Sequence, residues 1–97
     1  MKDKHAQGEH VLGMALSARG DYAAAEEKFA AALRIYGELR AESEAAKTRY
    51  EFGKMLLAKG NLAKGKATVE TALAVFARLG MRGWQEKCRK ALAGSTR

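Results

Sequence analysis

The 97-residue sequence contains no proline, a single cysteine and only eight β-branched residues. The absence of proline excludes collagen and proline-rich linkers, and the scarcity of valine, isoleucine and threonine leaves little material for a β-sandwich. Cys88 alone cannot form an internal disulfide, which favours a reducing compartment. His5 and His10 are five residues apart rather than three or four, so no metal site is predicted. We expect no cofactor.

Long hydrophobic runs are also missing. The longest uninterrupted apolar stretch covers residues 72–77, far short of the roughly 18 residues that a membrane span needs. The first residues lead into no signal-peptide core. We therefore expect a cytoplasmic protein without a membrane segment. The chain is instead rich in alanine, and this composition favours a single all-α domain.

Positive charge is concentrated in the second half of the chain, although the net charge of +7 comes from 18 basic and 11 acidic residues overall. Residues 1–48 carry seven Lys or Arg against eight Asp or Glu, a net −1, whereas residues 49–97 carry eleven against three, a net +8. Such an asymmetry speeds association with acidic partners, whether peptide, protein surface or nucleic acid, without choosing among them.

An internal repeat organises the chain. Shifting the segment 13–39 by 40 positions gives eight identities on one diagonal, which predicts two copies of one structural unit. The identical pairs are Gly13 and Gly53, Leu16 and Leu56, Ala18 and Ala58, Gly20 and Gly60, Ala23 and Ala63, Ala32 and Ala72, Leu33 and Leu73, and Leu39 and Leu79.

Each copy has the hydrophobic spacing of two helices separated by a glycine turn. Gly20 and Gly60 are predicted to close the first helices in the left-handed conformation, and Asp21 and Asn61 to cap the second helices with their side chains. Apolar or small residues recur at spacings of three and four in the second helices and predict a buried seam. That seam consists of Ala25, Phe29, Ala32, Leu33, Tyr36 and Leu39 in the first copy, and Gly65, Val69, Ala72, Leu73, Phe76 and Leu79 in the second.

The first helix of each pair is predicted to approach its partner closely at Gly13 and Gly53, where no side chain separates the backbones. Leu12 and Leu16 are predicted to face the second helix together with Gly13. Apolar residues also surround much of the remaining circumference of the first helix, so its outer side has no cap and is expected to need a partner. These residues are Val11, Leu12, Met14, Ala15 and Leu16.

A last amphipathic helix is predicted over about residues 81–93, followed by a tail at 94–97. Trp84, Cys88 and Leu92 fall at intervals of four, so one side of this helix can pack on the preceding repeat while charged faces meet water. We interpret Cys88 as a buried, inert thiol. Trp84 is interpreted as the anchor of the cap, with an exposed recognition residue as the alternative.

These residues resemble the tetratricopeptide repeat, in the 40-residue variant found in bacterial multidomain regulators. The resemblance implies a right-handed helical-hairpin solenoid of five helices, with repeats at about 4–41 and 44–80 and a capping helix. Unlike the family pattern, the chain has no tryptophan in the first helices, no proline, and a period longer than the family's usual one. The matching residues are Leu12, Gly13, Leu16, Gly20, Tyr22, Ala25, Phe29 and Ala32, and then Phe52, Gly53, Leu56, Gly60, Leu62, Gly65, Val69 and Ala72.

The resemblance implies a scaffold for protein interactions whose concave surface is built from the first helices. On these helices one row of residues projects away from the predicted helix contacts, and Lys87 and Lys90 continue it on the last helix. This row suits an acidic or amphipathic peptide with an apolar anchor. Each lysine in the row has the alternative of a solvated surface charge, and Tyr50 of a packing residue. The predicted groove contains Gln7, His10, Met14, Ser17, Lys47, Tyr50, Lys54, Leu57, Lys87 and Lys90.

Three functions remain open from the sequence. The first is a protein- or peptide-binding module, and the second is a self-associating element that uses the uncapped first helix. The third is weak nucleic-acid binding by the basic half, although Tyr50 is the only aromatic residue in the basic rows. We predict no enzymatic activity, because no nucleophile–base arrangement, phosphate loop or paired carboxylates between apolar walls can be placed.

Overall fold

A computed structural model describes residues 2–94, and within this range the chain is entirely helical apart from its turns, as predicted. Gly94 belongs to the last helix rather than to the predicted tail, and residues 95–97 of that tail lie outside the described residues. No helix among the described residues has the length and apolar character needed to cross a membrane. The five helices are α1 (Lys2–Ala18), α2 (Tyr22–Leu39), α3 (Glu42–Lys59), α4 (Leu62–Leu79) and α5 (Arg82–Gly94).

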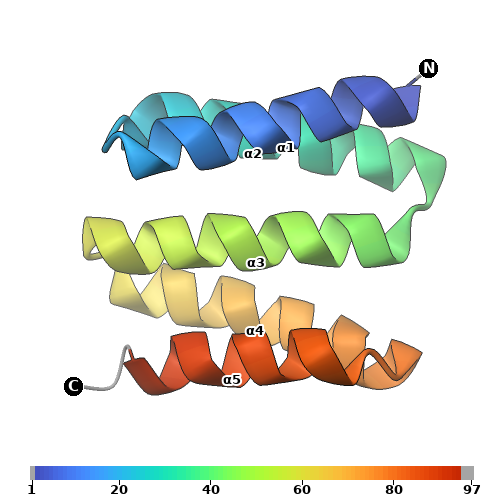
Figure 1. The fold of residues 1–97 in the computed structure, drawn as a ribbon, viewed down its shortest axis with the longest axis vertical. Coiled ribbons are helices and arrows are strands. Elements are labelled where there is room, and N and C mark those ends of the chain that lie inside the picture. The colour runs from blue at the N-terminus through green and yellow to red at the C-terminus, as the bar shows by residue number, and fades with distance from the viewer. Residues whose placement is uncertain (1, 95–97) are drawn as a thin grey trace.

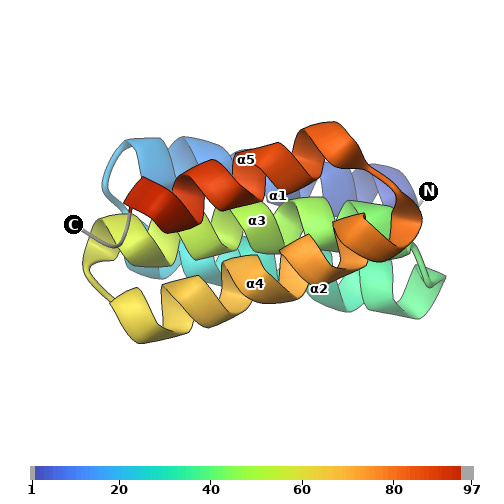
Figure 2. The same ribbon diagram turned by 90° about the horizontal axis from the view of Figure 1, so that it is seen from below.

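The helices form two hairpins and a fifth helix (Figure 1). Helix α1 packs mainly on α2 and α3 mainly on α4, while α5 packs on α4. Figure 2 shows α2 and α4 along one side of the molecule and α1 and α5 along the other, with α3 between them. The surface that α1, α3 and α5 share is called the α1–α3–α5 face below.

All four turns have the same geometry and recur at equal intervals along the chain. Gly20, Gly60 and Gly80 close their helices with φ values of +85°, +98° and +73°, and Arg40 does so at +56°. In each turn the following residue donates its backbone N–H to a carbonyl five residues back at 2.9 Å, which is the Schellman arrangement. The predicted left-handed turns at Gly20 and Gly60 are therefore confirmed, and each copy of the repeat consists of two equal helix-turn units.

The predicted side-chain caps at Asp21 and Asn61 are wrong. Neither side chain makes a capping hydrogen bond, and the ψ angles of the two residues are 67° and 74° rather than those of the extended conformation that aims a cap at the first turn. Each Schellman turn leads directly into the next helix, and the backbone carbonyl of Asp21 accepts the N–H of Ala25 at 2.9 Å. The Asp21 carboxylate instead lies 3.8 Å from Arg19.

The predicted seam forms most of the core but ends one turn early. Its members from Ala25 to Tyr36 and from Gly65 to Phe76 are buried, apart from the half-buried Leu33 and Leu73. Leu39 and Leu79, by contrast, are exposed. They are the last residues of α2 and α4, where the chain has already turned away and no neighbouring helix covers them.

Leu12 is not buried against α2 as the predicted contact would require, since the residue is 47% exposed. Its counterpart in the second copy, Phe52, is half-buried and packs beside Phe29 of the preceding hairpin. The difference follows from the position of each helix in the chain. Helix α3 has the preceding hairpin, through α2, against the side on which Phe52 lies, whereas no described helix lies against the corresponding side of α1. Leu16 is partly buried against the core, in line with the prediction.

Glycine permits the close approach of the helices inside each hairpin. A Cβ atom on Gly13 would lie 2.8 Å from the Phe29 ring, and one on Gly65 would lie 2.8 Å from the Leu57 side chain. At Gly53 the fit is tighter, since a Cβ there would overlap Val69 Cγ2 and approach the Val69 backbone nitrogen to 3.1 Å. Backbone cannot move aside as a flexible side chain can.

Replacing Gly53 by alanine is expected to lower the free energy of unfolding by about 1–3 kcal/mol through overpacking. Gly8→Ala is the matched control, because a Cβ on this exposed helical glycine meets nothing within 4 Å. That change should raise the free energy of unfolding by roughly 0.5–1 kcal/mol through helix propensity. Urea unfolding measures both. Equal effects of the two variants would contradict the close approach of α3 and α4.

Candidate functional site

The α1–α3–α5 face brings together much of the predicted groove around Trp84. The Trp84 ring stacks on Phe76 of α4, with centroids 5.4 Å apart and an interplanar angle of 27°. Tyr50 of α3 meets Trp84 edge-on at 5.7 Å. Trp84 therefore anchors α5 to the second hairpin. Tyr50 is only 8% exposed, so of its two predicted roles the structure favours packing over an open ligand platform.

Three predicted groove lysines lie over these aromatic rings. The Nζ atoms of Lys47 and Lys87 lie 5.4 and 4.3 Å from the Trp84 ring centroid, and that of Lys54 lies 4.6 Å from the Tyr50 centroid. The negative faces of aromatic rings attract ammonium groups at such distances. We call Lys47, Lys54 and Lys87 the lysine cluster. The three ammonium groups come from α3 and α5 and lie over the rings of Trp84 and Tyr50.

Two glutamates that the sequence reasoning missed belong to the same surface. Glu44 lies 3.8 Å from Lys47, and Glu51 lies 3.3 Å from Lys54. Burial lowers the pKa of Lys54, but Glu51 and Tyr50 outweigh it and raise that pKa above its usual value. Both pairs have the i,i+3 spacing that joins charges on one helix face, so this spacing could have revealed them.

Because of these two glutamates, the α3 and α5 parts of this face differ in net charge. On α3 they oppose the positive charge of Lys47 and Lys54, while Lys87 and Lys90 on α5 form no ion pair with any residue in the range 2–94. Unopposed positive charge on this face therefore lies on α5. Lys90 is exposed.

A cavity of about 260 Å³ lies between α1 and α3 beside the lysine cluster. Met14 and Ser17, both predicted groove residues, line it together with Lys54. Its other walls include Phe29 and Met55, both deeply buried in the core. The cavity thus combines an apolar base with a lysine at its rim. The remaining lining residues are Ala18, Glu51 and Ala58.

His10 is engaged in a hydrogen bond that links α1 to α3, so this ring nitrogen is not available to a ligand. Its Nδ1 atom lies 2.8 Å from the Thr48 hydroxyl, which donates its own hydrogen to the Glu44 carbonyl at 3.1 Å. When the hydroxyl donates to the Glu44 carbonyl it can only accept from His10, and this arrangement requires the proton on Nδ1. The ring also meets Phe29 edge-on at 6.2 Å. Burial lowers the His10 pKa, against the raising effect of Glu51 and Glu44.

Two predicted groove residues are not part of this arrangement. Leu57 is half-buried and packs against Gly65 of α4, because helix rotation carries this last part of α3 toward its hairpin partner. It is not a groove residue. Gln7 is exposed on α1, about two helical turns from Met14, the nearer of the two α1 groove residues that line the cavity.

Cys88 lies in the core below Trp84, as predicted. It is fully buried in the cluster formed by α3, α4 and α5, and this burial raises the pKa of its thiol. A raised pKa keeps the group protonated and unreactive. Among residues 2–94, no three His, Cys, Asp or Glu side chains are grouped so that they could hold a metal ion.

The lowered pKa of His10 predicts a loss of stability in mild acid. The unfolded chain takes up this proton near pH 6.5 and the folded protein only at lower pH, so stability is complete above pH 6.5 and falls as pH decreases through the lowered pKa. Urea unfolding across this range should show a weaker pH dependence for His10→Gln than for the wild type. His5→Gln is the control and should keep the His10 contribution. Parallel curves for the wild type and His10→Gln would contradict the prediction.

Comparison of the chain with known proteins gives no match. No family model fits it, and no curated protein or solved structure shows significant similarity to it. The tetratricopeptide resemblance therefore stays a prediction that rests on the repeat residues.

Proposed function

We propose that this protein is a tetratricopeptide-like scaffold that binds an acidic segment of another protein on its α1–α3–α5 face. The observation that carries the proposal is the lysine cluster, in which three ammonium groups are positioned over Trp84 and Tyr50. Positioned charges lose less side-chain entropy when a ligand binds than freely moving ones do. They also favour carboxylates over neutral groups.

The cavity between α1 and α3 supplies the second half of the recognition. It is apolar at its base and lies next to Lys54, so a leucine or phenylalanine of the partner can enter it while neighbouring carboxylates meet the lysines. Its volume of about 260 Å³ suits one such side chain rather than a whole small molecule. The proposed ligand is therefore an acidic peptide with one apolar anchor.

Nucleic-acid binding and catalysis have less support. Proteins bind single-stranded nucleic acids largely through aromatic rings on which bases stack, and Tyr50 and Trp84 are covered by each other and by lysines. Catalysis is not proposed, since the two titratable groups near the cavity, Glu51 and Lys54, are paired with each other.

A binding assay with short glutamate-rich peptides, each with or without one leucine, tests the proposal. Lys87→Gln removes a charge that no glutamate opposes and should weaken binding about two- to fivefold. Lys66→Gln removes the same charge from α4 and is the matched control. Ala58→Leu fills the cavity and should abolish the advantage of leucine-containing peptides. Equal weakening by Lys87→Gln and Lys66→Gln would show that only net charge matters and would overturn the proposal.

Self-association is the second candidate, because apolar side chains on α1 are exposed. Val11 is 61% exposed, and Met14 and Leu12 are also open to solvent. At the equivalent place in the second repeat, Phe52 is packed beside the preceding hairpin. Another helix against α1 would bury Leu12 in the same way.

Sedimentation equilibrium tests this candidate. If α1 mediates association, the wild type forms dimers at high concentration and Leu12→Glu is shifted toward the monomer by roughly tenfold or more in dissociation constant, since a carboxylate would be buried. Leu62→Glu is the matched control, because Leu62 on α4 has the same 47% exposure as Leu12 and should leave the dimer intact. A wild type that remains monomeric at millimolar concentration would rule out self-association.

A further inference from the structure

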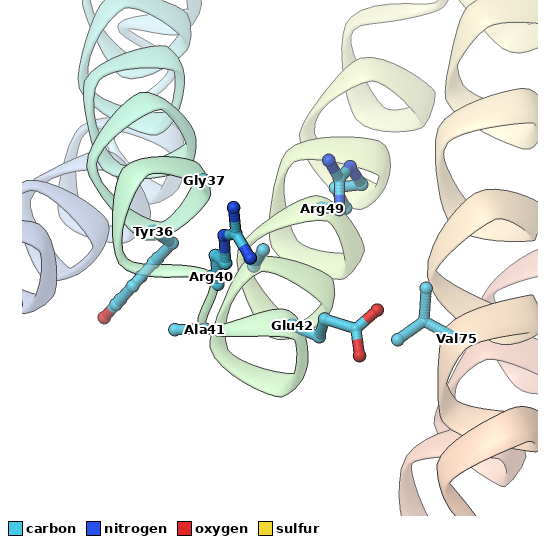
Figure 3. A pocket seen from close by; sticks show the side chains of 8 residues that line it. Tyr36, Gly37, Arg40, Ala41, Glu42, Arg49 and Val75 are labelled. Carbon is cyan, nitrogen blue, oxygen red and sulfur yellow. The ribbon is translucent and has the colours of Figure 1, made fainter.

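A larger cavity lies at the turn between α2 and α3, away from the lysine cluster (Figure 3). Its volume is about 490 Å³, within the usual range for small-molecule sites. Gly37 and Arg40 line it from the end of α2, Glu42 and Arg49 from α3, and Val75 from α4. Nothing in the proposed peptide binding uses this cavity.

Arg40 adopts a backbone conformation that its side chain disfavours. With φ of +56° it is the only non-glycine residue in the left-handed region among residues 2–94, whereas the three equivalent turns use Gly20, Gly60 and Gly80. A side chain in this conformation is strained. Strained residues that persist in a fold are concentrated at functional sites. The strain here places a guanidinium at the edge of the cavity.

Gly37 is a second departure at the same place. It lies inside α2, where glycine weakens a helix, and a Cβ atom added to it would meet nothing within 4 Å. Helix packing therefore does not explain this glycine, unlike Gly13 and Gly53. The equivalent position in the second repeat holds Ala77. Without a side chain at position 37, the cavity wall beside Arg40 stays open.

The charges around the cavity leave two arginines unopposed. Figure 3 shows the guanidinium groups of Arg40, at the α2–α3 turn, and of Arg49, on α3, at the cavity, while the Glu42 carboxylate extends toward Val75 of α4. Glu42 is already bonded to Arg78. Neither Arg40 nor Arg49 forms an ion pair or side-chain hydrogen bond with any residue in the range 2–94. The cavity therefore has two unpaired guanidinium groups, and its one lining carboxylate, Glu42, is paired with Arg78 instead.

We propose that this cavity binds the phosphate group of a small phosphorylated compound. Guanidinium groups bind phosphate through paired hydrogen bonds, and two of them balance the two charges of a phosphate monoester better than the single charge of a carboxylate. Val75 and Ala45 supply apolar walls for the organic part of the ligand. Phosphate binding would account both for the strained backbone at Arg40 and for the missing side chain at Gly37.

The test uses inorganic phosphate, phenyl phosphate and acetate as probes, with binding followed by calorimetry and by the amide NMR signals of residues 36–49. Phenyl phosphate should bind most tightly, inorganic phosphate less tightly and acetate most weakly. Arg49→Gln should weaken phenyl phosphate binding roughly tenfold, as expected when a charged hydrogen-bond donor is lost. Arg19→Gln, which removes the same charge at the α1–α2 turn, is the matched control and should bind normally.

Arg40→Gly separates binding from folding. It supplies the residue that the other three turns use, so its melting temperature should be equal to or higher than that of the wild type, while phenyl phosphate binding falls roughly tenfold. Gly37→Leu should block the cavity and also abolish binding. The proposal is overturned if phenyl phosphate does not shift the signals of residues 36–49, if acetate binds as tightly, or if Arg19→Gln weakens binding as much as Arg49→Gln.

Discussion

The structure depends on the contact between the two helices of each hairpin at a glycine. At Gly53 the space for a Cβ atom is taken by Val69 and by backbone of α4, and at Gly13 by the Phe29 ring. Such contacts bring the helix axes close enough for Phe29, Val69 and Phe76 to be fully buried between the helices. Together with four turns of one geometry at equal intervals along the chain, they give both hairpins the same shape. The alignment of α1, α3 and α5 on one side follows from this repetition.

Much of the fold could be predicted from the sequence because the repeat encodes it twice. Small and apolar residues recur in both copies, and glycine at positions 20 and 60 signals the left-handed turns. The errors occur where local pattern and tertiary surroundings differ. Leu39 and Leu79 continue the helical stripe but lie at helix ends, and Leu12 matches Phe52 but has no neighbouring hairpin to cover it. Spacing alone shows which face a residue is on and not whether another helix covers that face.

The lysines of the candidate site were also predictable, since they share one face of α3 and α5. Their immediate surroundings were not. Trp84 was interpreted as an anchor, with an exposed recognition residue as the alternative, and neither interpretation included the position of its ring beneath Lys47 and Lys87. The Arg40–Arg49 cavity escaped notice for a different reason: a left-handed turn without glycine has no sequence signal until the regular spacing of the turns is seen. The two surfaces lie on different parts of the fold and differ in their chemical groups, with ammonium groups over aromatic rings in one and two guanidinium groups in the other.

The central claim is that the α1–α3–α5 face is the surface that recognises acidic segments. Its most direct test is a map of the amide NMR signals that shift when a glutamate-rich peptide containing one leucine is added to the intact chain. The account predicts that the shifts follow the cavity and the lysine cluster, from Met14 and Ser17 through Lys54 to Lys87. Shifts confined to α2 and α4, or spread evenly over all basic residues, would contradict it.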